Sequence, residues 1–446
     1  MNKIILLLSC ISPIISITNQ RQLSVIIKSI LTMNGRITML GLSRWSEKGG
    51  SYSTINRFFH SEIDWLKVNW YFIKGHMPTI GAFLLAGDEV VVTKSGKHTH
   101  GIDRFFSSIQ NQTTSAISFL HLSIVSVESG KAWSIFTKQI VRENKEGCVK
   151  DKSKKKKKST KKSKSKSQEK KNKVGRKKGS KNKNKKVVEL SPYLKFVQES
   201  IIKVLAIINK FIPITYFLFD GAFGNNDAVQ MVLQSGLHLI SKLKKNSALH
   251  FEYTGDNKKQ KYGDKIDYNN LPKEYLKETK VEKDITIEIY QIKMLHKLFA
   301  DMLNIVIIVK TNTKKKRKAH VVLFSTDLEL SYEKLIHYYS LRFQIEFLFR
   351  DAKQYWGLED FMNIREKPIH NFANLSTFMV NFSYGMRKKL GNEKMGVINL
   401  KAHFHGLKYI DEIVKLLPKK PDAILMNKLY SKITTIGAIE EVKKVA

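Results

Sequence analysis

A lysine-rich run at residues 150–186 divides the chain into two parts that must fold around it. The run reads KDKSKKKKKSTKKSKSKSQEKKNKVGRKKGSKNKNKK and holds 21 Lys or Arg, against Asp151 and Glu169 as its acidic residues. A segment with a net charge of +19 and almost no apolar side chains repels itself and has no core to bury. We therefore predict that this insert is disordered in the free protein.

The charge of the whole chain favours a polyanionic partner. Its 78 Lys and Arg outnumber 39 Asp and Glu, which gives a formal net charge of +39. Nucleic acid is the first candidate partner and a membrane surface the weaker one. The stretch GRKKGSK resembles an AT-hook with Lys177 in place of the usual proline. We expect Arg176, Lys177 and Lys178 to contact DNA phosphates without groove specificity, the alternative being a solvated charge run.

The apolar N-terminus, MNKIILLLSCISPIISI, predicts a buried helix rather than a signal peptide or a membrane span. Pro13 interrupts the run, which is shorter than the ~20 apolar residues that cross a bilayer. Cys10 and Cys148 form no CxxC and indicate neither a metal site nor a disulfide framework. A soluble, cytoplasmic protein in a reducing compartment is expected.

Before the insert, helical patterns give way to strand patterns. Apolar spacing predicts helices in RQLSVIIKSILTMNG and in SYSTINRFFHSEIDWLKVNWYFI, with Ser51 or Ser53 as an N-cap. IGAFLLAGDEVVVTKSG, SAISFLHLSIVSVESG and AWSIFTKQIV predict a three-stranded antiparallel meander. A mixed α/β (α+β) fold is therefore expected.

After the insert, helices and strands alternate. Ser191 and Pro192 predict a helix start, and IPITYFLFD predicts a buried strand that runs into a glycine-rich turn. NDAVQMVLQSG predicts a helix and LHLISKLKK another strand. ITIEIYQIKMLHKLF, LNIVIIVKT and AHVVLFSTD predict further strands within residues 246–330.

A late amphipathic helix, IHYYSLRFQIEFLFRDAKQYWGLEDF, carries a polar strip beside an apolar one. At 100° per residue, five polar side chains fall within about 80° of arc; they are Tyr339, Arg342, Glu346, Arg350 and Lys353. Ion pairs between residues four apart would account for the charges on a plain surface helix. The alternative is a phosphate-binding surface whose single carboxylate serves a metal ion.

Two aspartates close buried strands elsewhere in the chain. Asp88 ends FLLAGD and Asp220 ends ITYFLFD, and a single Asp in such a place is often only a turn former. Together with Glu346 they make three carboxylates that can hold two Mg²⁺ ions for displacement at phosphorus. Glu89 follows Asp88 directly, and neighbouring strand residues point to opposite faces, so only one of the two should reach the metals.

This order of motifs resembles a DDE transposase of the bacterial insertion-sequence-4-like group. Tyr339-x2-Arg342-x3-Glu346-x6-Lys353 fits that group's Tyr-Arg-Glu-Lys signature, and GDEVVVTKSGKHTHGIDRFF and FDGAFGNN resemble its two other acidic blocks. The resemblance implies an RNase H-like core in which Asp88, Asp220 and Glu346 are catalytic and bind two Mg²⁺ ions, with Mn²⁺ able to substitute. It also implies that Tyr339, Arg342 and Lys353 grip DNA phosphates, while Arg350 shares their face outside the signature.

The resemblance implies cut-and-paste transposition by a nucleoid-associated enzyme. Such an enzyme binds terminal inverted repeats, cleaves the strands with Mg²⁺ and joins the 3′ ends to target DNA, as a homodimer on DNA. One alternative is an RNase H-like DNA endonuclease without strand transfer. Another is a non-catalytic DNA-binding derivative of a transposase.

A chain of 446 residues predicts several domains. The helical N-terminal part, 1–76, is interpreted as a DNA-binding domain, with an ordinary helical cap as the alternative. The other expected parts are the first part of the core (77–149), the insert (150–186), the second part of the core (187–245), a strand-rich insertion domain (246–330), the catalytic helix and end of the core (331–390), and a C-terminal helical region (391–446).

Overall fold

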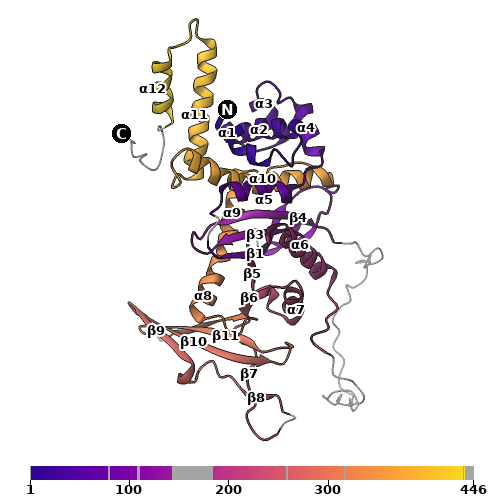
Figure 1. Cartoon of the computed structure of the whole chain (residues 1–446), viewed down its shortest axis with the longest axis vertical. Coiled ribbons are helices and arrows are strands. Elements are labelled where there is room, and N and C mark those ends of the chain that lie inside the picture. The colour runs from indigo at the N-terminus through magenta and orange to yellow at the C-terminus, as the bar shows by residue number, and fades with distance from the viewer. Residues whose placement is uncertain are drawn as a thin grey trace, which may run out of the picture.

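The structure, a computed structural model, describes residues 2–78, 81–107, 111–142, 184–257, 260–315, 317–434 and 436 (Figure 1). Most of the lysine-rich insert, with Arg176, Lys177 and Lys178, lies outside these residues. Within them, no helix is long and apolar enough to cross a bilayer.

The N-terminal part is helical, as its apolar spacing predicts. Its elements are α1 (Asn2–Leu8), η1 (Ser9–Ile11), α2 (Ile17–Thr32), α3 (Met39–Trp45), α4 (Tyr52–His60) and α5 (Trp65–His76). The Ser51 hydroxyl caps α4 by accepting a hydrogen bond from the Thr54 N–H at 3.3 Å. The predicted helix after Ser51 is two helices, because the Asp64 carboxylate accepts from the Lys67 N–H at 3.1 Å and starts a new one.

The core sheet combines an antiparallel meander with two parallel strands. Its elements are β1 (Phe83–Thr93), β2 (Asp103–Ser107), β3 (Gln112–Ser126), β4 (Ala132–Ile140), α6 (Pro192–Ile208), β5 (Ile214–Leu218), η2 (Gly221–Phe223), α7 (Asn226–Gln234) and β6 (His238–Leu243). β3 pairs antiparallel with both β1 and β4, whereas β5 pairs parallel with β1 and with β6. The predicted mixed α/β fold is confirmed, and β2 is an additional short strand that the pattern did not predict.

The strand-rich segment continues this sheet. Its elements are β7 (Leu249–Glu252), β8 (Tyr262–Lys265), η3 (Lys273–Tyr275), β9 (Leu276–Glu282), β10 (Ile285–His296), β11 (Leu303–Asn312) and β12 (Arg317–Ser325). β12 pairs antiparallel with β6, from Val322 opposite Leu243 to Ser325 opposite Ile240. The described strands therefore form one 12-stranded sheet.

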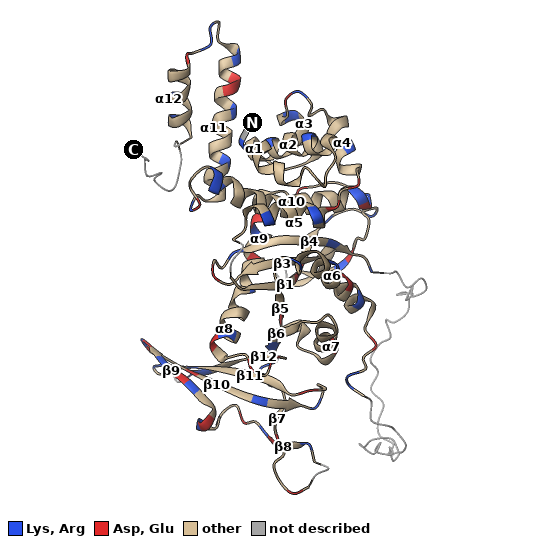
Figure 2. Ribbon diagram, in the orientation of Figure 1, with Lys and Arg blue, Asp and Glu red and all other residues tan. Residues whose placement is uncertain are grey.

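Further helices follow the strand-rich segment in the described part of the chain, and helices cover both faces of the core sheet. The last ones are α8 (Tyr332–Leu341), α9 (Phe343–Tyr355), α10 (Glu366–Lys389), α11 (Val397–Leu416) and α12 (Ala423–Ile433). Side chains of α9 and α10 share one hydrophobic core with the N-terminal helices, and α6 and α7 belong to a second. The helical end and the strand-rich end lie on opposite sides of the core sheet, and Lys and Arg occur along the whole molecule (Figures 1 and 2).

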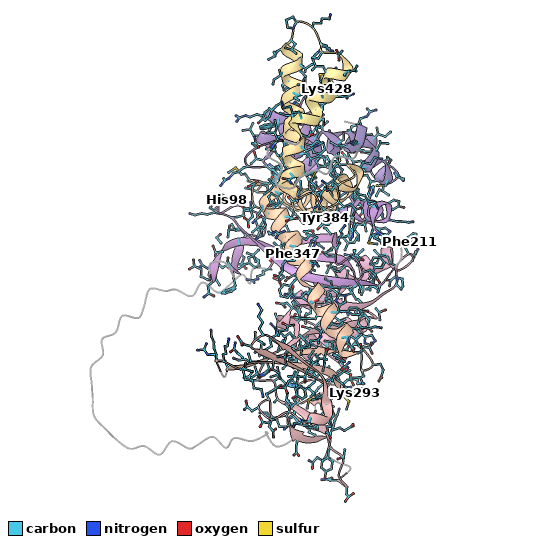
Figure 3. All side chains as sticks on the ribbon, turned by 90° about the vertical axis from the view of Figure 1, so that its left-hand side faces the viewer. His98, Phe211, Lys293, Phe347, Tyr384 and Lys428 are labelled. Carbon is cyan, nitrogen blue, oxygen red and sulfur yellow. The ribbon has the colours of Figure 1, made fainter. Side chains whose placement is uncertain are left out.

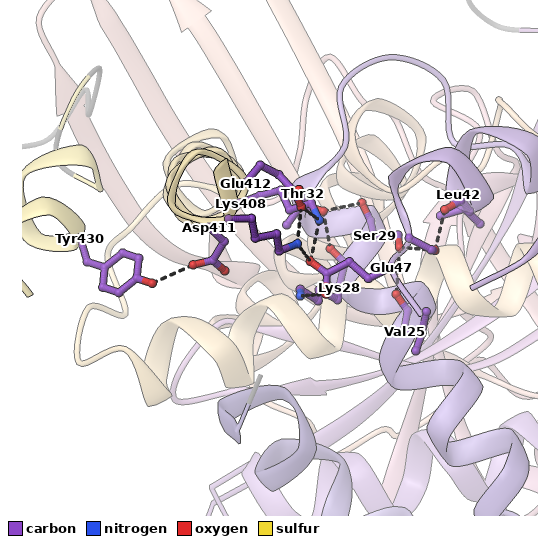
Figure 4. Close-up of polar contacts among 12 residues, drawn as sticks. Val25, Lys28, Ser29, Thr32, Leu42, Glu47, Lys408, Asp411, Glu412 and Tyr430 are labelled. Carbon is purple, nitrogen blue, oxygen red and sulfur yellow. Dashed lines mark hydrogen bonds and ion pairs between the residues drawn. The ribbon is translucent and has the colours of Figure 1, made fainter. Parts of the chain in front are cut away.

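Glu47 joins the N-terminal helices to α11 (Figure 4). Its carboxylate lies 2.7 Å from Lys408 Nζ and 3.2 Å from Lys28 Nζ. The hydrogen bond from Lys408 is the largest cause that lowers the pKa of Glu47 to about 2, and Lys28 adds to it against the opposing effect of burial. The carboxylate is therefore ionised throughout the ordinary pH range.

We expect Glu47→Gln to lower the free energy of unfolding by about 1 kcal/mol at pH 7, because solvent screens this partly exposed cluster. Because the pKa of Glu47 is lower in the folded protein, its ionised carboxylate stabilises the fold at pH values above the ordinary pKa of 4.5. This stabilisation is lost as the pH falls toward about 2. Urea unfolding at several pH values measures the difference. Glu412→Gln is the control, because Glu412 contacts Lys408 and Lys415 within α11 alone. An equal loss of unfolding free energy in both variants would contradict the proposal that Glu47 joins the N-terminal helices to α11.

Candidate active site

Strand alternation on β1 separates Asp88 from Glu89. Leu84, Ala86 and Val90 belong to the hydrophobic core that contains α9, whereas Phe83 and Leu85 belong to the core that contains α6. Side chains two residues apart share a face of a strand. Asp88 therefore faces α9, and Glu89 faces away and lines a cavity of about 970 Å³ with Tyr193 and Phe196.

The parallel pairing of β1 with β5 brings Asp220 to the same face as Asp88. Ala86 pairs with Leu218, and each aspartate follows its paired residue by two positions. Leu218 also belongs to the core that contains α9. Asp88 and Asp220 therefore lie at the same level of the sheet, on the face that α9 covers.

Backbone groups orient both carboxylates. Asp88 Oδ1 accepts a hydrogen bond from the Glu89 N–H at 2.8 Å. Asp220 Oδ1 accepts from the Ala222 N–H at 2.9 Å, and the Asp220 carbonyl accepts from the Ser241 hydroxyl at 2.7 Å. Each aspartate is thus held through one carboxylate oxygen by the turn or strand that follows it.

Gly87, next to Asp88, allows the close approach of β5. A Cβ atom at this position would lie 2.8 Å from the Phe217 ring and 3.2 Å from Leu122. Contacts this short would force the ring or the strand to move. The absence of a side chain at Gly87 therefore helps to set the spacing of the two aspartate-bearing strands.

The predicted single helix is interrupted at Arg342. α8 ends at Leu341 and α9 begins at Phe343, and the Arg342 N–H bonds to the Tyr339 carbonyl three residues back, at 3.2 Å. This is the tighter hydrogen bonding of a 3-10 turn. The single helix that the spacing predicts is therefore corrected to two helices that meet at Arg342.

Arg342 links Asp88 to Glu346. Its Nη1 lies 3.3 Å from Asp88 Oδ2 and its Nη2 lies 2.7 Å from Glu346 Oε1. Burial raises the pKa of Asp88 to about 6, against the opposing effects of the Glu89 N–H and Arg342, and the charges of Asp220 and Glu346 raise it further. Asp88 therefore lies within electrostatic range of both other carboxylates.

Tyr339 lies beside this cluster. The Arg342 guanidinium carbon is 6.0 Å from the centroid of its ring. Burial raises the pKa of Tyr339 above its ordinary value, and Asp220 and Glu346 contribute in the same direction. Its phenol therefore stays protonated at neutral pH and can donate a hydrogen bond.

The two remaining cations of the predicted strip bind protein groups. Lys353 Nζ donates to the Val91 carbonyl at 2.9 Å and pairs with Glu359 at 2.9 Å. The Arg350 guanidinium pairs with Asp351 at 3.1 Å, and its carbon lies 5.1 Å from the centroid of the Phe347 ring. Figure 3 shows Phe347 in the middle of the molecule.

The donor set suits a divalent cation, although its present arrangement does not hold one. Carboxylate oxygens are the ligands that Mg²⁺ prefers, and Asp88 lies close enough to Asp220 and Glu346 for their charges to raise its pKa, although burial is the larger cause. Among the described residues, no group of three His, Cys, Asp or Glu is placed to share a metal. The expected convergence of Asp88, Asp220 and Glu346 on one metal is therefore absent from this arrangement, in which Arg342 bridges two of them.

Two residues near the site gave no signal in the sequence. His121 lies opposite Asp88 on β3 and is fully buried, with its ring nitrogens 2.8 Å from the Thr137 hydroxyl and 3.0 Å from the Ser123 hydroxyl. Burial raises the pKa of Tyr193, and the charges of Glu89, Asp88 and Asp220 raise it too. An isolated His in a strand and a Tyr in the first turn of a helix belong to no sequence motif, so the sequence did not indicate either residue.

Comparison with solved structures gives a distant match. The chain is similar to a piggyBac transposase in a cryo-EM structure of its synaptic complex with hairpin DNA, at 10% identity and a TM-score of 0.36. The match covers 98% of this chain and 80% of the other. A similarity this low carries no argument about function. No curated protein matches the chain.

A family model gives a more extensive match. The model is described as DDE superfamily endonuclease and matches residues 10–294, which include Asp88 and Asp220 and end before Glu346. This match covers more than half of the chain and confirms the expected DDE relationship. The chain belongs to the DDE superfamily of endonucleases.

Proposed function

We propose that this chain is a DDE transposase of the insertion-sequence-4-like group, which cleaves the ends of its element and joins them to target DNA. The observation that supports this most directly is the placement of Asp88 and Asp220 on one face of adjacent parallel strands, with Glu346 on the helix packed over them. The family match supports the cleavage step. Terminal inverted repeats as the binding sites, and a homodimer on DNA, are parts of the same proposal.

Asp88, Asp220 and Glu346 would hold Mg²⁺, which when bound supplies activation of a water or 3′ hydroxyl and stabilisation of the leaving oxygen. The chain orients part of this set, although the three carboxylates do not converge while Arg342 bridges Asp88 and Glu346. Asp88 and Asp220 are each oriented by a backbone N–H, and Glu346 projects from α9, whose apolar side packs on the sheet. In-line displacement at phosphorus would also require the three carboxylates to converge, because the reacting groups must be held in the correct geometry.

DNA phosphates would be bound by the neighbouring polar groups. Tyr339 can donate from its phenol, and Arg342 and Lys353 can donate from charged groups, which gives the stronger hydrogen bonds to phosphate. Arg350 and the basic insert would add contacts farther along the backbone. The N-terminal helices would complete the DNA-binding surface. We also propose that the chain is divided into domains at the boundaries expected from the sequence.

The first test replaces each carboxylate with its amide. Asp88→Asn, Asp220→Asn and Glu346→Gln should each abolish Mg²⁺-dependent cleavage of duplexes taken from the DNA on either side of the coding sequence. DNA binding, followed by fluorescence anisotropy, should remain because the basic residues are unchanged. Glu89→Gln is the matched control and should keep cleaving, since Glu89 lies on the other face of β1.

The same assay separates transposition from simple cleavage. Labelled ends incubated with a target plasmid should become joined to it. Cleavage without joining would make the protein an endonuclease and remove the strand-transfer part of the proposal. Normal cleavage by any of the three amide variants would remove that residue from the site.

Gly87→Ala tests whether strand spacing matters to the reaction. The added methyl group would meet the Phe217 ring and move Asp88 relative to Asp220, so cleavage should fall by about 10²-fold. Gly396→Ala is the control, because no atom lies within 4 Å of a Cβ placed there. Equal cleavage rates in the two variants would show that this contact does not position the carboxylates.

Tyr339→Phe tests the proposed phosphate contact. The change removes one hydroxyl and keeps the ring, so a phosphate-binding phenol predicts weaker binding to end duplexes and slower cleavage. A surface role predicts no change in either. Filter-binding and cleavage rates, measured on the same duplex, distinguish the two.

A further inference from the structure

The Arg342 guanidinium occupies the space between two carboxylates that the proposed function assigns to a metal. Its two terminal nitrogens reach Asp88 at 3.3 Å and Glu346 at 2.7 Å. The arginine side chain is only 10% exposed, whereas that of Glu346 is 46% exposed. A single planar group thus joins β1 to α9 and places its positive charge where a cation shared by these carboxylates would lie.

This buried position does not satisfy the whole guanidinium. Arg342 Nε is buried and has no hydrogen-bond partner among the described residues. Its N–H is a donor, and a buried donor without an acceptor is unfavourable. Between the two carboxylates, in what we call its inner position, the guanidinium is therefore stabilised by two ion pairs and not by a complete set of hydrogen-bond acceptors.

The guanidinium that pairs with the two carboxylates also lies beside an aromatic ring. The ring of Phe343 is half-exposed, and its centroid lies 5.0 Å from the guanidinium carbon. Arginine stacks well on aromatic faces. Arg342 is the single residue between α8 and α9, and the half-exposed Phe343 ring offers a surface on which its guanidinium would stack after leaving the two carboxylates.

We propose that Arg342 is a latch that closes the carboxylate site to metal until a DNA phosphate draws its guanidinium outward. In the free protein Arg342 pairs with Asp88 and Glu346, and on DNA it pairs with phosphate and leaves both carboxylates to the metal. The inference rests on the proposed function, because it takes these carboxylates to be metal ligands. DNA and metal then bind cooperatively, since each favours the outward position.

Calorimetric titration of the DNA-free, full-length protein with Mn²⁺ tests the latch. Arg342→Gln removes the bridging group, so Mn²⁺ should bind about tenfold more tightly than to the wild type if the outward position is populated at about one part in ten. Lys242→Gln is the control for charge. Lys242 packs beside Gly221, next to Asp220, so this change removes a positive charge near the site without removing the bridge.

Arg342→Lys separates the bridge from its charge. Lysine keeps the charge but lacks the planar fork that reaches two carboxylates at once, so Mn²⁺ affinity should again exceed that of the wild type. The latch would be overturned if both Arg342 variants, or Arg342→Lys alone, bound Mn²⁺ with wild-type affinity. It would also be overturned if Lys242→Gln gained as much Mn²⁺ affinity as the Arg342 variants. A thermal melt establishes that each variant is folded, and if Arg342→Gln does not fold, Arg342→Lys decides.

The outcome also distinguishes the latch from the function on which it rests. Mn²⁺ binding that is lost in Asp88→Asn and unaffected by the Arg342 variants would leave the metal site intact and remove the latch. Absence of Mn²⁺ binding in the wild type and in every variant would remove both, because the carboxylates would then not form a metal site.

Discussion

The parallel pairing of β1 with β5 is the constraint on which the rest of the candidate site depends. Ala86 lies opposite Leu218, and this register fixes where both strands carry their aspartates. A shift of one residue in either strand would turn its aspartate to the opposite face, toward α6 and α7. The buried residues on both faces of β1 prevent such a shift, because each face packs into its own core. Hydrophobic packing therefore specifies the position of the polar site.

Much of this arrangement could be predicted from the sequence, because it follows from local patterns. The apolar runs before Asp88 and Asp220 gave the two strands, and Ser191 with Pro192 gave the start of α6. The prediction that Asp88 closes its strand was wrong, because β1 continues to Thr93. The expectation that Asp88 and Glu89 point to opposite faces agrees with the alternation of buried residues on β1, whereas the choice of Asp88 as the metal ligand came from the family resemblance and stays a prediction.

The features that could not be predicted depend on contacts between distant segments. The spacing of the polar strip gave no sign that Arg342 would turn inward and interrupt the helix, because its partner Asp88 lies 254 residues away. Lys353 likewise reaches the Val91 carbonyl, a backbone group that no side-chain pattern reveals. The pairing of β12 with β6 was also hidden, since antiparallel partners far apart in sequence share no local signal.

That pairing has a mechanical consequence. The strand-rich segment is hydrogen-bonded to the core sheet through β6, and the Tyr216 hydroxyl donates to Asp327 at 2.5 Å, just beyond the end of β12. α8 starts five residues after Asp327 and packs on β6, β11 and β12 before the chain reaches α9. α8 therefore lies between the strand-rich segment and α9, so the position of β11 and β12 constrains where the helix that carries Glu346 begins.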